Sequence, residues 1–142
     1  MAEYNKAFFN LYETTFLVLK KDLGYEKALE IFRQIIEKLL GDAFDSVGFK
    51  KGNTKEFERI VGERDRAVGL RVEFPQVTKN KIVYRDYDKI FPGLQGHMKL
   101  QDLVDVLIGF KVRHILGGGW ECRINKHLWK GDKYTEYIIE KK

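Results

Sequence analysis

The run Tyr84-Arg85-Asp86-Tyr87-Asp88 is the densest group of polar and aromatic side chains in the sequence. Alternate residues of a strand face opposite sides, so Tyr84 and Asp86 would share one face, and Arg85 and Tyr87 the other. An arginine between aromatic rings suits a planar anion such as a carboxylate. We therefore predict a site for a small apolar or carboxylated ligand, with a salt-bridged surface hairpin as the alternative. The candidate ligand-binding residues are Arg71, Tyr84, Arg85, Tyr87 and His127.

Acid–base, nucleophilic and metal chemistry have few candidate residues. His127 lies opposite Glu136 in the expected C-terminal hairpin and could be a base that Glu136 orients, but an exposed cross-strand pair is the simpler interpretation. Cys122 has no base nearby in the sequence, so we expect a small buried hydrophobe. No histidine is spaced four residues from another histidine or cysteine, so we predict no metal site and no cofactor, and no catalytic residue is assigned.

Composition sets the class of protein. The 142 residues suit a single domain, 1–142, and 44 % hydrophobic residues can form a core. One cysteine, no leader at the N-terminus and no long apolar run predict a cytoplasmic protein with no membrane partner. The net charge of +5 is spread over short clusters, so we predict no nucleic-acid partner. Charged residues at 33 % and a single serine resemble proteins from hot environments.

Helical periodicity dominates the first part of the chain. Apolar spacings of three and four predict helices over Asn5–Asp22 and Tyr25–Leu40, joined at Gly24 as a helical hairpin. Residues 41–52 contain three glycines and are expected to be a connection. Asn53-x-x-Glu56 resembles a capping box that opens a short helix to Val61, which Gly62 would end.

Alternating patterns predict the strands. Residues 68–74 and 82–87 are expected to pair as a hairpin, with Pro75 limiting the first strand. A long helix over 100–116 separates them from a final hairpin, whose turn is placed at Gly131-Asp132. Counting outward from that turn sets Arg123 opposite Glu140 and Ile124 opposite Ile139. The chain is thus expected to be α+β: an N-terminal helical hairpin and a third long helix packed on a mostly antiparallel sheet that ends in a C-terminal β-hairpin.

The glycines at 117–119 could suggest a phosphate-binding loop. They leave a helix and enter a strand, however, whereas a phosphate loop leads from a strand into a helix N-terminus. We interpret them as a helix stop.

The last forty residues resemble a known family. An amphipathic helix with Gly109, a glycine stop, a strand and then Lys130-Gly131-Asp132 before an apolar strand are similar to the C-terminal part of the 4-vinyl reductase domain family. That family belongs to a superfamily of small-molecule-binding domains that also includes haem-based nitric oxide sensors and vesicle-tethering subunits. The resemblance implies an α+β fold with a ligand pocket between helices and sheet.

The chain departs from this family at the zinc-binding positions, and it also resembles a second family. Some family members bind zinc through a Glu and two Cys, but those positions fall on Ile124, His127 and Thr135, so the resemblance implies no zinc here. The segment 125–137 also resembles the tail of the L-2-amino-thiazoline-4-carboxylate hydrolase family, with Thr135 in place of that family's Cys.

Three functions remain open from the sequence. The first is a sensor-like small-molecule-binding domain, with an apolar pocket and no chemistry of its own. The second is a hydrolase of a small carboxylated heterocycle, in which Arg71 or Arg85 would converge with an acid or His127. The third is a non-catalytic homodimeric interaction module, with an exposed apolar helix face and no pocket.

Overall fold

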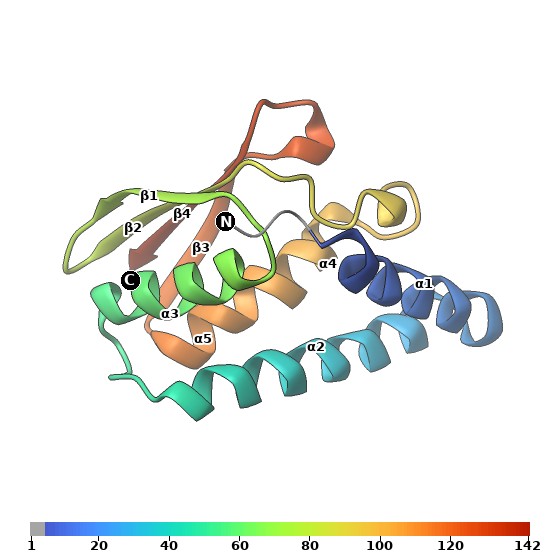
Figure 1. The fold of residues 1–142 in the computed structure, drawn as a ribbon, viewed down its shortest axis with the longest axis horizontal. Helices are drawn as coiled ribbons and strands as arrows, with labels where there is room; N and C mark the ends of the chain where they lie inside the picture. The colour runs from blue at the N-terminus through green and yellow to red at the C-terminus, as the bar shows by residue number, and fades with distance from the viewer. Residues whose placement is uncertain (1–4) are drawn as a thin grey trace.

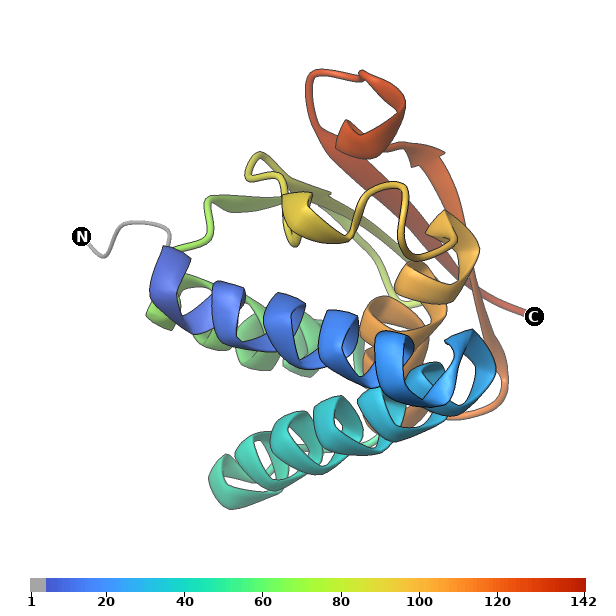
Figure 2. The ribbon, with the colours of Figure 1, turned by 90° about the vertical axis from the view of Figure 1, so that its right-hand side faces the viewer.

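Helices and an antiparallel sheet form two sides of the domain, in a computed structural model that describes residues 5–142. The four strands lie in the order β1-β2-β4-β3, and every neighbouring pair is antiparallel. Figures 1 and 2 show the helices gathered on one side of this sheet, α3 and α5 nearer to it and α1 and α2 farther away. The α+β class is therefore confirmed. The elements are α1 (Lys6–Leu23), α2 (Tyr25–Val47), α3 (Thr54–Ala67), β1 (Val72–Val77), β2 (Lys81–Asp86), α4 (Leu100–Val104), α5 (Phe110–Ile115), β3 (Trp120–Lys126) and β4 (Thr135–Lys141), with short 3-10 turns at Pro92–Leu94 and Leu128–Lys130.

The opening helical hairpin forms where the sequence places it. The Asn5 side chain caps α1 by accepting a hydrogen bond of 3.0 Å from the Phe8 backbone N–H. Gly24 ends α1 with a φ of +83°, a conformation that glycine adopts without steric cost. Phe16 of α1 and Phe32 of α2 are fully buried and contact each other edge-to-face, which ties the two helices together.

Helix α2 is longer than predicted. It continues through Gly41 to Val47, so the expected connection over 41–52 is wrong for its first seven residues. Gly41 is buried, and a methyl group built on it would lie 3.5 Å from Cζ of Phe110, so the helix backbone passes close to α5 there. Phe44 is buried in the added turns, and its packing outweighs the weak helix preference of glycine.

Gly41 inside α2 and Gly48 at its C-cap are expected to respond in opposite ways to substitution by alanine. Gly41→Ala should raise the free energy of unfolding by about 0.5–1 kcal/mol, because the methyl group meets only ordinary contacts and alanine favours the helix. Gly48→Ala should lower it by about 1 kcal/mol, because the C-cap Gly48 has a φ of +71°. Urea unfolding of both variants tests this. A loss of stability in Gly41→Ala would show that α2 cannot accommodate even a methyl group against Phe110.

Helix α3 also passes the glycine that was expected to end it. Asn53 caps it by accepting a hydrogen bond of 3.1 Å from the Glu56 backbone N–H, as predicted. The Glu56 carboxylate does not complete a capping box, because it accepts from the backbone N–H of Lys50 instead. The helix then continues through Gly62 to Ala67, so the expected end at Val61 is wrong. A methyl group on Gly62 would lie 2.9 Å from Nη1 of Arg66 and 3.4 Å from Cε2 of Phe74, so both a side chain of α3 itself and one of β1 lie close to this glycine. The extension brings Asp65 into the core.

The first hairpin pairs as expected, but its first strand is displaced. β1 begins at Val72 rather than Val68, and it includes Pro75 instead of stopping before it. The β1–β2 register shifts between Glu73 and Gln76, so Pro75 lies in an irregular part of the pairing. β1 is an edge strand, where a proline without an N–H is tolerated.

The C-terminal hairpin has a different register from the predicted one. Arg123 lies opposite Ile138 and Ile124 opposite Tyr137, two residues away from the expected partners. The connection is longer than a two-residue turn because Leu128–Lys130 forms a 3-10 turn, while Asp132 and Thr135 accept from the backbone N–H groups of His127 and Leu128. A shift of two residues keeps the side chains up to Ile124 on their predicted faces, but the register shifts once more between Ile124 and Lys126, so the prediction fails from there to His127.

Candidate functional site

An apolar pocket lies between the helices and the loop that follows β2. Its volume is about 60 Å³. Aromatic and aliphatic side chains form most of its wall, and three charged side chains complete it. The apolar wall comes from α1 (Phe8, Phe9, Tyr12), α2 (Ile36, Leu39, Leu40) and later segments (Val68, Leu70, Ile90, Phe91, Leu107), and the charged residues are Arg64, Asp65 and Lys111.

A buried ion pair forms the polar part of this pocket. Asp65 and Lys111 are 3 % and 8 % exposed, and Nζ of Lys111 lies 3.5 Å from Oδ1 of Asp65. The other carboxylate oxygen of Asp65 accepts a hydrogen bond from the Tyr84 hydroxyl, which is also buried. Burial, followed by the negative charges of Asp65 and Asp86, raises the pKa of Tyr84 well above its ordinary value, so its hydroxyl stays a donor.

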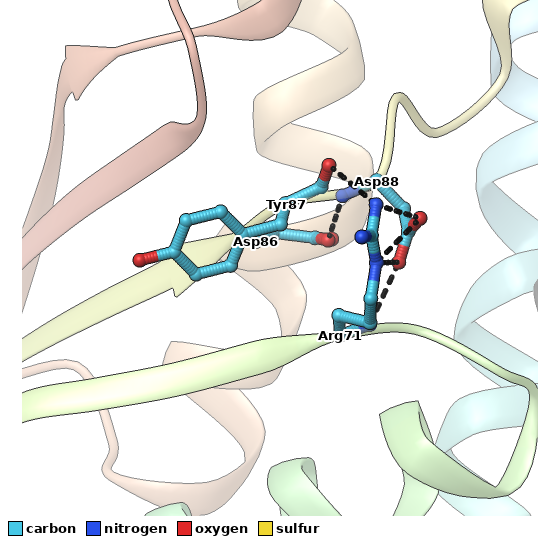
Figure 3. Close-up of polar contacts among 4 residues, drawn as sticks. All are labelled: Arg71, Asp86, Tyr87 and Asp88. Atoms are coloured by element: carbon cyan, nitrogen blue, oxygen red, sulfur yellow. Dashed lines mark hydrogen bonds and ion pairs between the residues drawn. The ribbon is translucent and has the colours of Figure 1, made fainter. Parts of the chain in front are cut away.

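A second buried carboxyl lies behind the first pocket. Asp86 is 2 % exposed and lines a cavity of about 10 Å³ with His127, Thr135 and Tyr137. Its Oδ1 accepts from the Asp88 N–H at 2.9 Å, drawn in Figure 3. Burial, and then the neighbouring charge of Asp65, raises the pKa of Asp86 well above its ordinary value, which favours the protonated form. Ile90 and Leu107 line both cavities and separate them.

Two irregular segments contribute to the pocket wall. The expected helix over 100–116 contains a π-helical turn at Asp105–Gly109, which carries Leu107 and immediately precedes the helix of Lys111. Phe91 has a φ of +51°, an unusual conformation for a bulky residue, although it is only 2 % exposed. π-turns and strained backbone conformations both concentrate at functional sites, so their coincidence around one pocket marks this region.

Arg71 and Tyr87, two of the predicted ligand-binding residues, lie outside this pocket. Figure 3 shows the Arg71 guanidinium facing the Asp88 carboxylate, with an Nη2–Oδ1 distance of 3.0 Å, and the Tyr87 ring pointing away from that pair. The Arg71 backbone N–H also donates to Asp88 at 2.7 Å. Arg71 is exposed, and these contacts close the end of the first hairpin.

Arg85 and Tyr84 lie on opposite faces of β2, as the alternation predicts. Arg85 donates to Glu136 of β4, and its guanidinium lies 4.7 Å from the centre of the Tyr134 ring. Burial alone would raise the pKa of Glu136, but hydrogen bonds from Arg85 and Asn125 outweigh it and lower that pKa. Tyr84 faces the helices and stacks on Phe74. The five candidate residues are therefore not brought together into one site.

His127 is buried rather than exposed, so the cross-strand pair expected with Glu136 is wrong. Only 4 % of the residue is exposed, and Nδ1 accepts a hydrogen bond of 3.1 Å from the Trp129 backbone N–H. Trp129 in turn donates its indole N–H to the carbonyl of Ile90 at 3.1 Å, which holds the hairpin end against the loop of the pocket. Burial, then the charge of Lys130, lowers the pKa of His127 to about 4, against an opposing effect of Asp132.

This lowered pKa predicts that the domain loses stability in mild acid. Between pH 6.5 and about 4 the unfolded chain binds a proton at His127 that the folded chain does not, so the free energy of unfolding falls as pH falls. The slope from this residue should approach about 1.4 kcal/mol per pH unit. Urea unfolding from pH 7 to pH 4.5, compared with His127→Gln, isolates the contribution. Equal slopes in both proteins would contradict it.

Cys122 is half-buried and packs against the core, whereas a fully buried side chain was expected. Burial raises the pKa of its thiol to about 12, so the reactive thiolate is disfavoured. Among residues 5–142, no three His, Cys, Asp or Glu side chains come together in a group that could hold a metal ion. No helix in that same range is long and apolar enough to span a membrane.

The charged pair of the pocket, Asp65 and Lys111, was not among the predicted site residues. A signal was present in the spacing: Asp65 follows Phe57 and Val61 at intervals of four, on the face of α3 that is buried. Lys111 likewise lies four residues before Ile115 and four after Leu107. Charged residues at apolar positions of a helix are rarely buried unless they are paired, so an oppositely charged partner could have been predicted for each of them.

A basic hollow at the other end of α3 also brings separate segments together. Lys50, Lys51 and Lys55 surround the N-terminus of the helix, and Lys79 reaches it from the β1–β2 turn. No acidic side chain of the described chain lines this open hollow. The lysines expected to be spread are therefore locally concentrated.

Comparisons with known proteins place the chain in no family. No protein-family model matches it, and the search of curated proteins finds no match either.

Proposed function

We propose that this protein is a cytosolic, sensor-like small-molecule-binding domain, related to the 4-vinyl reductase family, whose ligand occupies the apolar pocket between α1, α2, α3 and α5. The observation that carries the proposal is one pocket with an apolar wall, a buried Asp65–Lys111 pair and two irregular backbone segments. Ligand pockets typically combine such an apolar wall with a few fixed polar groups. The family resemblance implies a pocket between helices and sheet, whereas this one lies between the helices and the segments that flank β1 and β2.

The two alternatives have less support from the described residues. The hydrolase was expected to bring Arg71 or Arg85 together with an acid or His127 in a cleft. Arg71 binds Asp88 and Arg85 binds Glu136, but neither arginine lines the apolar pocket or the cavity of His127. An interaction module was expected to have an exposed apolar helix face and no pocket, whereas the structure has a pocket. Binding without chemistry is therefore the function that the described residues support best.

Xenon is the first probe, because the pocket is smaller than the roughly 150 Å³ apolar cavity that holds benzene. Dissolved xenon should shift the NMR methyl signals of Leu39, Leu40 and Leu107, because these residues line the pocket. Native mass spectrometry of the purified protein, set against the denatured mass, should also show a bound molecule where one is retained.

A pair of variants shows whether the xenon effect comes from the pocket. Leu39→Trp should fill the pocket and remove the shifts at Leu40 and Leu107. Leu11→Trp, at an exposed position of α1, should leave them unchanged. Xenon shifts spread evenly over the methyl groups of the protein, or absent altogether, would contradict a binding pocket here.

A further inference from the structure

The charges of the pocket wall do not cancel. Three charged side chains line it: Arg64 and Lys111 are cationic and Asp65 is anionic. Asp65 is already engaged by Tyr84 and Lys111. The other buried carboxyl, Asp86, lines the separate cavity behind Ile90 and Leu107; burial and the charge of Asp65 raise its pKa, and the charge of Lys111 opposes that rise. The pocket therefore has one positive charge more than its own acid balances.

Lys111 is loosely paired. Its 3.5 Å separation from Asp65 exceeds the 2.7–2.9 Å that is usual for a hydrogen bond between an ammonium and a carboxylate. An ammonium has three N–H donors, and the contact with Asp65 occupies at most one of them. Since Lys111 also lines the pocket and is largely removed from water, its remaining donors are available to a group inside.

We propose that the ligand is a small apolar molecule with one negative charge, a carboxylate that lies against Nζ of Lys111 while its apolar part packs on the rings of α1 and the leucines of α2. This inference rests on the proposed function and specifies its ligand class. A buried carboxylate is stable only when it is paired, and Lys111 supplies that partner at a point already shielded from water. Arg64, whose guanidinium lies 6.0 Å from the centre of the Phe8 ring, adds positive charge to the same wall.

Three probes of similar shape separate charge from size. They are propanoate, propanamide and propylamine, which all have fewer heavy atoms than benzene and carry a negative, no and a positive charge at pH 7.4. Each is titrated into the whole protein while the methyl signals of Leu39, Leu40 and Leu107 are followed by NMR. The acid should bind about tenfold more tightly than the amide, because a hydrogen bond to a charged partner adds about that factor.

Substitution of the lysine should remove the preference. In Lys111→Met the acid and the amide should bind with equal affinity, whereas Lys38→Met, at an exposed position of α2, should keep the tenfold difference. Because Lys111→Met leaves Asp65 buried without its cation, Asp65→Asn/Lys111→Met removes both charges of the buried pair and leaves Arg64 in the wall. That double variant should bind the amide as the wild type does and show no preference for the acid.

The outcomes distinguish this inference from the function on which it rests. Equal binding of acid and amide by the wild type, or tighter binding of the amine, overturns the carboxylate and leaves the pocket. Methyl shifts with xenon but with none of the three probes also overturn the carboxylate alone. If neither xenon nor any probe shifts these signals, the binding function itself is contradicted.

Discussion

Replacement of Asp65 by alanine should lower the free energy of unfolding by about 3–5 kcal/mol, the cost of breaking a buried ion pair by removing one partner. Lys111 would keep its charge at 8 % exposure with no carboxylate beside it, and the buried Tyr84 hydroxyl would lose its acceptor. Urea unfolding followed by tryptophan fluorescence measures the change. The melting temperature of the variant should also be lower than that of the wild type.

Two comparisons make the result specific to the buried pair. Asp42→Ala removes a carboxylate from an exposed pair with Lys38, where both side chains are more than 60 % exposed, and should cost no more than about 1 kcal/mol. Adding Lys111→Met to Asp65→Ala should recover part of the lost stability, because it removes the unpaired charge. If Asp65→Ala costs no more than Asp42→Ala, Lys111 reaches water in solution and the pocket is not closed at that end.

The sequence shows helices more reliably than it shows where they end. Periodicity placed α1, α2, α3 and the helix over 100–116 correctly, and the asparagine cap expected at Asn53 forms. The errors fall at Gly41 and Gly62, each of which was interpreted as a stop. Both glycines instead lie inside helices whose neighbouring residues are buried, Phe44 after Gly41 and Val61 before Gly62, and this packing is a tertiary effect that local propensity cannot contain.

The candidate site was harder to predict, for a related reason. Face alternation correctly put Tyr84 inside and Arg85 outside, but it could not show that Arg71 and Arg85 already have carboxylate partners. His127 was misplaced because the turn was counted as two residues, whereas Asp132 and Thr135 satisfy the backbone of a longer connection. A buried lysine in a charge-rich sequence resembles a surface lysine until its partner is known.

Phe91 offers a test of strain in the pocket wall. Its ring packs edge-to-face against Phe9 and Phe32 at 5.5 and 6.0 Å, and it is 2 % exposed, so Phe91→Ala should cost about 3–5 kcal/mol. The residue also has a φ of +51° and precedes Pro92, whereas glycine alone adopts that conformation freely. Phe91→Gly should therefore be about 1 kcal/mol more stable than Phe91→Ala. Urea unfolding of the two variants measures the difference.

The same pair of substitutions at Phe16 supplies the control. Phe16 is fully buried in α1, in a helical conformation, so Phe16→Gly should be about 1 kcal/mol less stable than Phe16→Ala. If Phe91→Gly is more stable than Phe91→Ala while Phe16→Gly is less stable than Phe16→Ala, the loop after β2 holds Phe91 in a backbone conformation that this residue does not prefer. That cost persists only because the surrounding aromatic rings fix the side chain in the wall. If the alanine variant is more stable than the glycine variant at both positions, Phe91 relaxes in solution and its conformation gives no support to a preformed pocket.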